Sequence, residues 1–96
     1  MPSLSKLIFV FEETRKLLER PQNDFTWSSW EDREAALGEI DQVLSALRSG
    51  NLPGESTLEV LFAPTGPIQE VSLSSGWDDD FIRLSDMFDE AMTNET

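Results

Sequence analysis

The sequence predicts a single small α+β domain over residues 1–96, in which a two-stranded antiparallel hairpin packs against three helices in the order ααββα. Two observations support this fold class. Apolar residues recur with helical spacing in three segments, and two short apolar runs flank a turn-forming Pro-Thr-Gly-Pro sequence. A chain of this length buries enough surface for one modest core. Residues 1–2 and 94–96 are expected to be loose.

The first expected helix spans residues 3–20 and carries a wide apolar face. One half of its helical projection contains Leu4, Leu7, Ile8, Val10, Phe11, Leu17 and Leu18. Phe9 falls outside this arc, and Pro21 marks the end of the helix. Because such a wide arc exceeds what one neighbour usually covers, we expect this helix to lie between two elements or to contact a second subunit. Phe9 and Val10 form the candidate oligomer face.

The second helix is expected from about Trp30 to Arg48, with Ser29 as its N-cap and Gly50 just past its end. Its apolar face consists of Ala36, Leu37, Ile40, Val43, Leu44 and Leu47. The third helix is expected to follow Ser75, its proposed cap, from about Trp77 to Met92. Its apolar side consists of Phe81, Leu84, Met87, Phe88, Ala91 and Met92.

Residues 57–63 and 68–74 are the predicted strands of the hairpin. If Ala63 pairs with Ile68, one face of the hairpin becomes apolar and consists of Leu58, Val60, Val71 and Leu73. Leu61 then falls on the other, mixed face. Because two strands alone are marginal in water, we expect the hairpin to lie on the helices, to gain strands from a second subunit, or both.

The formal net charge is −12, and nearly all of the excess negative charge lies after residue 20. Residues 1–20 carry four basic and three acidic side chains, whereas residues 21–96 carry three basic and sixteen acidic ones. Such a field repels phosphate backbones and anionic membranes and attracts basic surfaces. The sequence therefore predicts a protein that binds neither nucleic acid nor membranes and that docks a basic protein partner.

The chain contains no cysteine and no histidine. Thiolate nucleophiles, imidazole acid-base catalysis and metal sites built on these ligands are thereby excluded. The apolar run at residues 7–11 is too short to span a membrane and is followed directly by Glu12 and Glu13. We expect a cytoplasmic, non-enzymatic protein with no cofactor and no metal.

The stretch Ser-Ser-Gly-Trp-Asp-Asp-Asp-Phe at residues 74–81 is the most suggestive of a function. In the first turn of a helix, Asp78, Asp79 and Asp80 interact favourably with the helix dipole, and we favour this structural role. A recognition surface and a metal site completed by other carboxylates are the alternatives. Successive helical side chains point about 100° apart, so these three alone do not converge on one ion.

Three tryptophans lie near the expected helix starts, at Trp27, Trp30 and Trp77. Core packing is the commonest role for such residues, while a protein interface and a small-molecule pocket are the alternatives. With the three aspartates they form the candidate interaction surface. The first hypothesis for function is a non-catalytic module that docks a basic protein. The alternatives are a structural homodimer, formed through the first helix or a hairpin edge, and a protein or enzyme that depends on a divalent cation.

Overall fold

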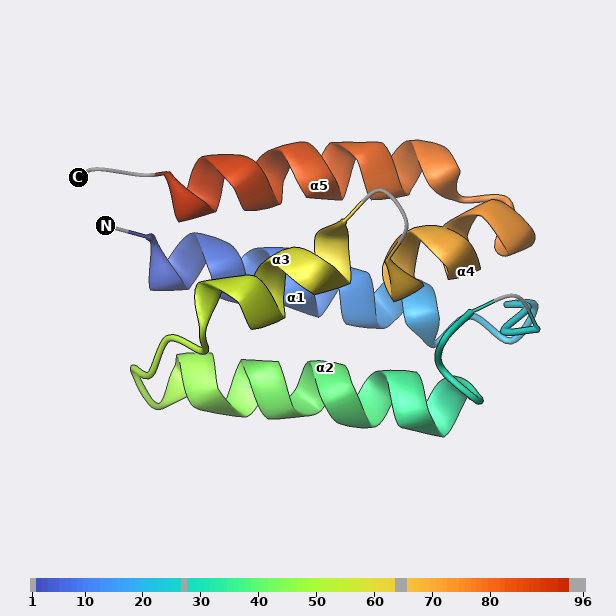
Figure 1. Cartoon of the computed structure of the whole chain (residues 1–96), viewed down its shortest axis with the longest axis horizontal. Coiled ribbons are helices and arrows are strands. Elements are labelled where there is room, and N and C mark those ends of the chain that lie inside the picture. Colours follow the sequence, from blue (N-terminus) through green and yellow to red (C-terminus); the bar gives the residue numbers. More distant parts are fainter. Residues whose placement is uncertain (1, 27, 64–65, 94–96) are drawn as a thin grey trace.

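The computed structural model describes residues 2–26, 28–63 and 66–93, and the regular structure of these residues is entirely α-helical. Figure 1 shows its five helices, which are α1 (Leu4–Leu18), α2 (Arg33–Arg48), α3 (Glu55–Phe62), α4 (Pro67–Ser75) and α5 (Asp78–Met92). The predicted α+β class and ααββα order are therefore wrong, since no strand occurs in the described part of the chain. Trp27 and the middle of the expected hairpin turn lie outside the described residues.

Helix α1 lies at the centre of the molecule and packs against α2 on one side and α5 on the other. Helices α3 and α4 lie across a third side of α1 (Figure 1), where Phe11 of α1 meets Phe62 of α3 edge to face at 5.5 Å between ring centres. Leu7 and Phe11 are fully buried. The wide apolar face predicted for the first helix is confirmed, and neighbours within this chain cover most of it.

The residues predicted to form the two strands, 57–63 and 68–74, lie almost entirely in the helices α3 and α4. Leu58, Leu61 and Phe62 are buried and follow the i, i+3, i+4 spacing of one helical face. The four residues of the predicted apolar hairpin face do not share one environment. Leu58 and Val71 are buried, whereas Val60 is 60% exposed and Leu73 is 61% exposed. A two-stranded hairpin would leave two edges of unpaired backbone, whereas a helix pairs backbone groups within its own segment and needs no neighbouring strand. A short apolar run fits either period, so the sequence pattern alone misled the prediction.

Gly66 and Pro67, which suggested the second half of a hairpin turn, are at the start of a helix instead. Gly66 is the N-cap of α4 and Pro67 is its first residue, a position where the missing amide hydrogen of proline costs nothing. At the other end, Gly76 adopts φ 82° and closes α4 in the left-handed conformation. Two short helices therefore fit where one extended hairpin was expected.

Two of the expected helix caps are also wrong. Helix α2 begins at Arg33, and its N-cap is Asp32, whose carboxylate accepts a hydrogen bond from the amide of Ala35 at 2.9 Å. Ser29 therefore does not cap this helix. Ser75 is the last residue of α4, and no side chain caps the start of α5. The apolar faces predicted for α2 and α5 are nevertheless buried or half-buried, as expected.

Candidate functional site

The segment at residues 74–81 joins α4 to α5 and holds the connector between α1 and α2 in place. Trp77 is only 3% exposed, and its Nε1 donates a hydrogen bond to Oδ1 of Asn23 at 2.8 Å. The Ser75 hydroxyl accepts a hydrogen bond from the amide of Asp24 at 2.9 Å. Because Asn23 and Asp24 belong to the connector, Ser75 and Trp77 have a clear structural role.

The three aspartates that follow Trp77 form the first turn of α5. Asp78 and Asp79 are exposed, while Asp80 is half-buried and pairs with Arg83 at 3.4 Å. Negative charge at this position interacts favourably with the amino end of the helix. The aspartates are thus placed as first-turn residues, and two of them remain open to solvent.

The described tryptophans of the candidate interaction surface belong to the core. Trp30 is 6% exposed, and its Nε1 donates a hydrogen bond to the Glu39 carboxylate. Trp77 is buried as described above, and Trp27 lies outside the described residues. In this conformation the aromatic part of the predicted surface does not extend to Trp30 or Trp77, whereas Asp78 and Asp79 remain accessible.

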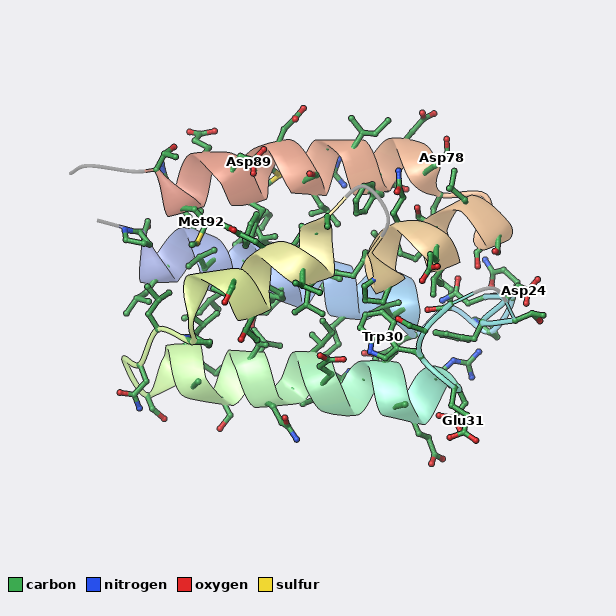
Figure 2. The ribbon with its side chains drawn as sticks, in the orientation of Figure 1. Asp24, Trp30, Glu31, Asp78, Asp89 and Met92 are labelled. Carbon is green, nitrogen blue, oxygen red and sulfur yellow. The ribbon has the colours of Figure 1, made fainter. Side chains whose placement is uncertain are left out.

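One end of the molecule gathers acidic side chains from the connector, the start of α2, α4 and the start of α5, and Figure 2 shows Asp24 and Glu31 of the connector and Asp78 of α5 at this end. The two hydrogen bonds to Ser75 and Trp77 hold the connector against the start of α5, and the amide of Ser29 donates to Glu70 of α4 at 3.1 Å. We call this region the acidic end and define it by Asp24, Glu31, Asp32, Glu34, Glu70, Asp78 and Asp79. Among the described side chains, none of these seven forms an ion pair.

Asp24 takes part in the local structure of the acidic end. Hydrogen bonds from the Thr26 hydroxyl and from the Thr26 amide, the latter at 2.9 Å, lower the pKa of the Asp24 carboxyl below its ordinary value.

Two arginines also lie near this end. Arg33 donates a hydrogen bond to the Arg20 carbonyl oxygen at 3.0 Å, which holds one guanidinium against the backbone.

The ion pairs of the described residues lie mainly on α1 and on the parts of α2 and α5 that reach it. Five of them involve α1, namely Lys6–Glu90, Arg15–Glu19, Arg15–Asp41, Lys16–Glu13 and Arg48–Glu12. A hydrogen bond from Arg15 to Asp41, at 2.6 Å, lowers the pKa of the Asp41 carboxyl and raises the pKa of the guanidinium. The Glu13 hydrogen bond likewise raises the pKa of Lys16. Side chains of both signs therefore lie along α1.

The candidate oligomer face on α1 is divided between an exposed and a buried residue. Phe9 is 48% exposed, whereas Val10 is buried. The two residues lie at a hollow of about 300 Å³ between α1 and α5, which Met87 and the Lys6–Glu90 pair also line. The other proposed route to a dimer, through a hairpin edge, no longer exists because α3 and α4 are helices.

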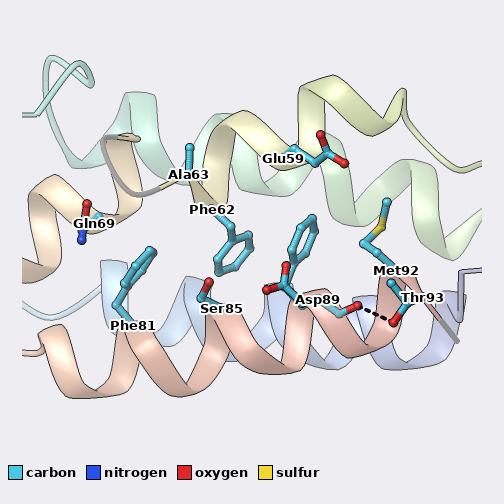
Figure 3. Close-up of a pocket in the computed structure, with 10 residues that line it drawn as sticks. Glu59, Phe62, Ala63, Gln69, Phe81, Ser85, Asp89, Met92 and Thr93 are labelled. Atoms are coloured by element: carbon cyan, nitrogen blue, oxygen red, sulfur yellow. Dashed lines mark hydrogen bonds between the residues drawn. The ribbon is translucent and has the colours of Figure 1, made fainter.

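A larger groove, of about 560 Å³, lies between α3 and α5 (Figure 3). Three phenylalanines line its floor. Phe62 stacks on Phe88 with ring centres 4.7 Å apart and on Phe81 with ring centres 6.1 Å apart. Glu59 of α3 and Asp89 of α5 carry carboxylates on opposite sides of this row of rings. The groove thus combines an apolar floor with an acidic rim.

Sequence reasoning missed this groove because it placed residues 57–63 in a strand. With that assignment, Glu59 and Phe62 fell on opposite faces of a hairpin. The signal that would have found the groove was the helical spacing of Leu58, Leu61 and Phe62. A helix at this position brings Glu59 and Phe62 to neighbouring positions, one turn apart.

Within the described residues, no group of three or more acidic side chains is placed to hold a metal ion. The same part of the chain includes no helix both long enough and apolar enough to cross a membrane.

Comparison with protein-family models, with curated proteins and with solved structures finds no match to this chain.

Proposed function

We propose that this protein is a non-catalytic interaction module that docks a basic protein partner through its acidic end. The observation that carries the proposal is the convergence of acidic side chains from the connector, the start of α2, α4 and the start of α5 at one end of the fold.

The distribution of charge further supports this proposal. The ion pairs that involve α1 neutralise much of the charge around that helix, while the seven carboxylates of the acidic end have no basic partner among the described side chains. Unpaired carboxylates of like sign repel one another in the free protein and attract a basic surface. Docking of a basic partner would relieve this repulsion and would be fastest at low salt.

The test compares the wild type with an acidic-end variant that carries Glu31→Gln, Glu34→Gln, Asp78→Asn and Asp79→Asn. We expect pull-downs from the native cell to recover a specific basic protein with the wild type at low salt and to recover much less at high salt. The acidic-end variant should associate more slowly with that purified partner, because electrostatic steering acts chiefly on the association rate.

A control variant removes the same four charges from the neighbourhood of α1, through Glu12→Gln, Glu13→Gln, Glu19→Gln and Glu90→Gln. We expect it to retain the partner, since these carboxylates are already paired with basic side chains and are not among the seven residues of the acidic end. Equal loss of binding in both variants would mean that the net charge of the protein, and not the position of the acidic end, determines the binding. Failure to recover any specific partner at low salt would contradict the proposal.

A second candidate function, self-association through α1, is favoured by the exposure of Phe9. Two residues further along α1, Phe11 points to the opposite side and contacts α3, so Phe9 faces away from that layer. The hollow beside Phe9 offers a place for the Phe9 ring of a second copy. Ion pairs such as Lys6–Glu90 and Lys16–Glu13 reduce the net negative charge near α1 and would let two copies of an acidic protein approach at this face.

We expect Phe9→Ser to weaken self-association, because it removes the exposed aromatic side chain that would fill the hollow of the second copy. Light scattering over a range of concentrations measures the effect. The matched control is Ile82→Ser, which removes an exposed apolar side chain from α5 outside the hollow. A wild-type protein that stays monomeric at every concentration would contradict this candidate.

A further inference from the structure

We propose that the groove between α3 and α5 binds a basic amphipathic segment of the docking partner, with apolar side chains on the phenylalanine floor and Lys or Arg heads at the acidic rim. This inference rests on the proposed function. It adds a second site on the same protein and specifies what the partner must present there.

The floor of the groove provides the apolar half of the site. Phe62, Phe81 and Phe88 are nearly covered by one another and by Phe11, so their positions are fixed by the core. Their remaining accessible edges line the groove together with Ala63 and Met92. A rigid apolar floor accepts an aliphatic or aromatic side chain at little entropic cost to the protein.

The rim provides the charge. Glu59 is exposed on α3 and Asp89 is exposed on α5, so the two carboxylates flank the floor from different helices (Figure 3). Neither forms an ion pair with a described side chain. An anionic occupant would meet both charges, whereas a Lys or Arg side chain can lay its alkyl stem over a ring and place its head against a carboxylate.

The extent of the groove favours a chain segment as its occupant. Its lining runs along α5 from Phe81 to Thr93, which corresponds to about 18 Å of helix at 1.5 Å per residue. A segment of about three helical turns has this length and presents apolar residues at i, i+3, i+4 and i+7. A basic segment with this pattern matches the floor and the rim together.

The experiment uses a synthetic amphipathic peptide of leucine and lysine as the probe. A second peptide has the same lysines with alanine in place of every leucine. Two methionines of the protein report on location, because Met92 lines the groove and Met87 lines the hollow beside Phe9. We expect the leucine-lysine peptide to shift the Met92 methyl resonance and to leave that of Met87 in place. We expect the alanine-lysine peptide to bind at least about tenfold more weakly.

The rim is tested by the pair Glu59→Gln and Asp89→Asn, with Glu13→Gln and Glu90→Gln as a control that removes the same charge near α1. We expect the rim variant to bind the leucine-lysine peptide at least about threefold more weakly than the control does. Equal affinities for the two peptides, or for the two variants, would overturn the groove and leave docking at the acidic end intact. If neither peptide binds at low salt, both the groove and the attraction of basic partners are contradicted.

Discussion

Replacement of Leu61 by alanine is expected to lower the free energy of unfolding by about 2–5 kcal/mol, which denaturant titration measures. Leu61 is 2% exposed in α3 and belongs to the hydrophobic core. Truncation removes apolar contacts and leaves a cavity that the surrounding side chains fill only in part. In a hairpin, Leu61 would lie on the mixed face and its truncation would cost much less.

The matched control for this prediction is Val60→Ala, one residue earlier. Val60 is exposed on the outer side of α3, so its truncation should change the stability by no more than about 0.5 kcal/mol. Alanine also has a higher helix propensity than valine, which favours a small gain. A hairpin predicts the reverse order, because Val60 would then lie on the apolar strand face. A greater loss for Val60→Ala than for Leu61→Ala would therefore contradict the helical α3.

The sequence was sufficient to predict the long helices because each contains many repeats of the helical period. In α1, α2 and α5, apolar residues recur over 15 or 16 residues, and no strand pattern explains them as well. The break in this pattern at Phe9 was also informative, since Phe9 is the exposed large apolar residue of α1. Helix ends were less predictable, because Ser29 and Asp32 are both residues that cap helices.

The short helices α3 and α4 were not predictable in the same way. With 8 and 9 residues, each offers little more than two helical turns, and β-branched residues such as Val60 and Val71 also favour strands. Their conformation depends on long-range packing. Phe62 of α3, for example, packs against Phe11, Phe81 and Phe88, which belong to other helices. A pattern within 20 residues does not contain that information.

The candidate sites also differ in how far the sequence alone predicts them. Runs of charged residues can be read directly from the sequence, so it predicted acidic side chains at the start of the last helix, where Asp78 and Asp79 are exposed. The groove depends on the position of α3 relative to α5, which followed from the helical conformation that sequence reasoning missed. Burial of Trp30 and Trp77 depends likewise on contacts with distant residues, through Glu39 and Asn23.

Replacement of Gly66 by alanine is expected to lower the free energy of unfolding by about 1–3 kcal/mol. A Cβ atom at this position would collide with the carbonyl oxygen of Val60 and would lie 3.1 Å from that of Ala63. These obstacles are backbone atoms of α3 and its C-cap, so no side-chain rotation removes them. Either the end of α3 moves away from the start of α4 or the new methyl group remains strained, and a shift of α3 would also displace the Glu59 side of the groove.

Gly38→Ala is the matched control and should have the opposite sign. Gly38 is exposed within α2, and a Cβ atom there meets no other atom within 4 Å. Alanine at this position should raise the stability by about 0.5–1 kcal/mol, because glycine loses more conformational freedom when a helix forms. Denaturant unfolding of both variants measures the difference. If Gly66→Ala were as stable as the wild type, the carbonyl of Val60 would not lie over Gly66, and the close junction that positions α3 beside the groove would be wrong.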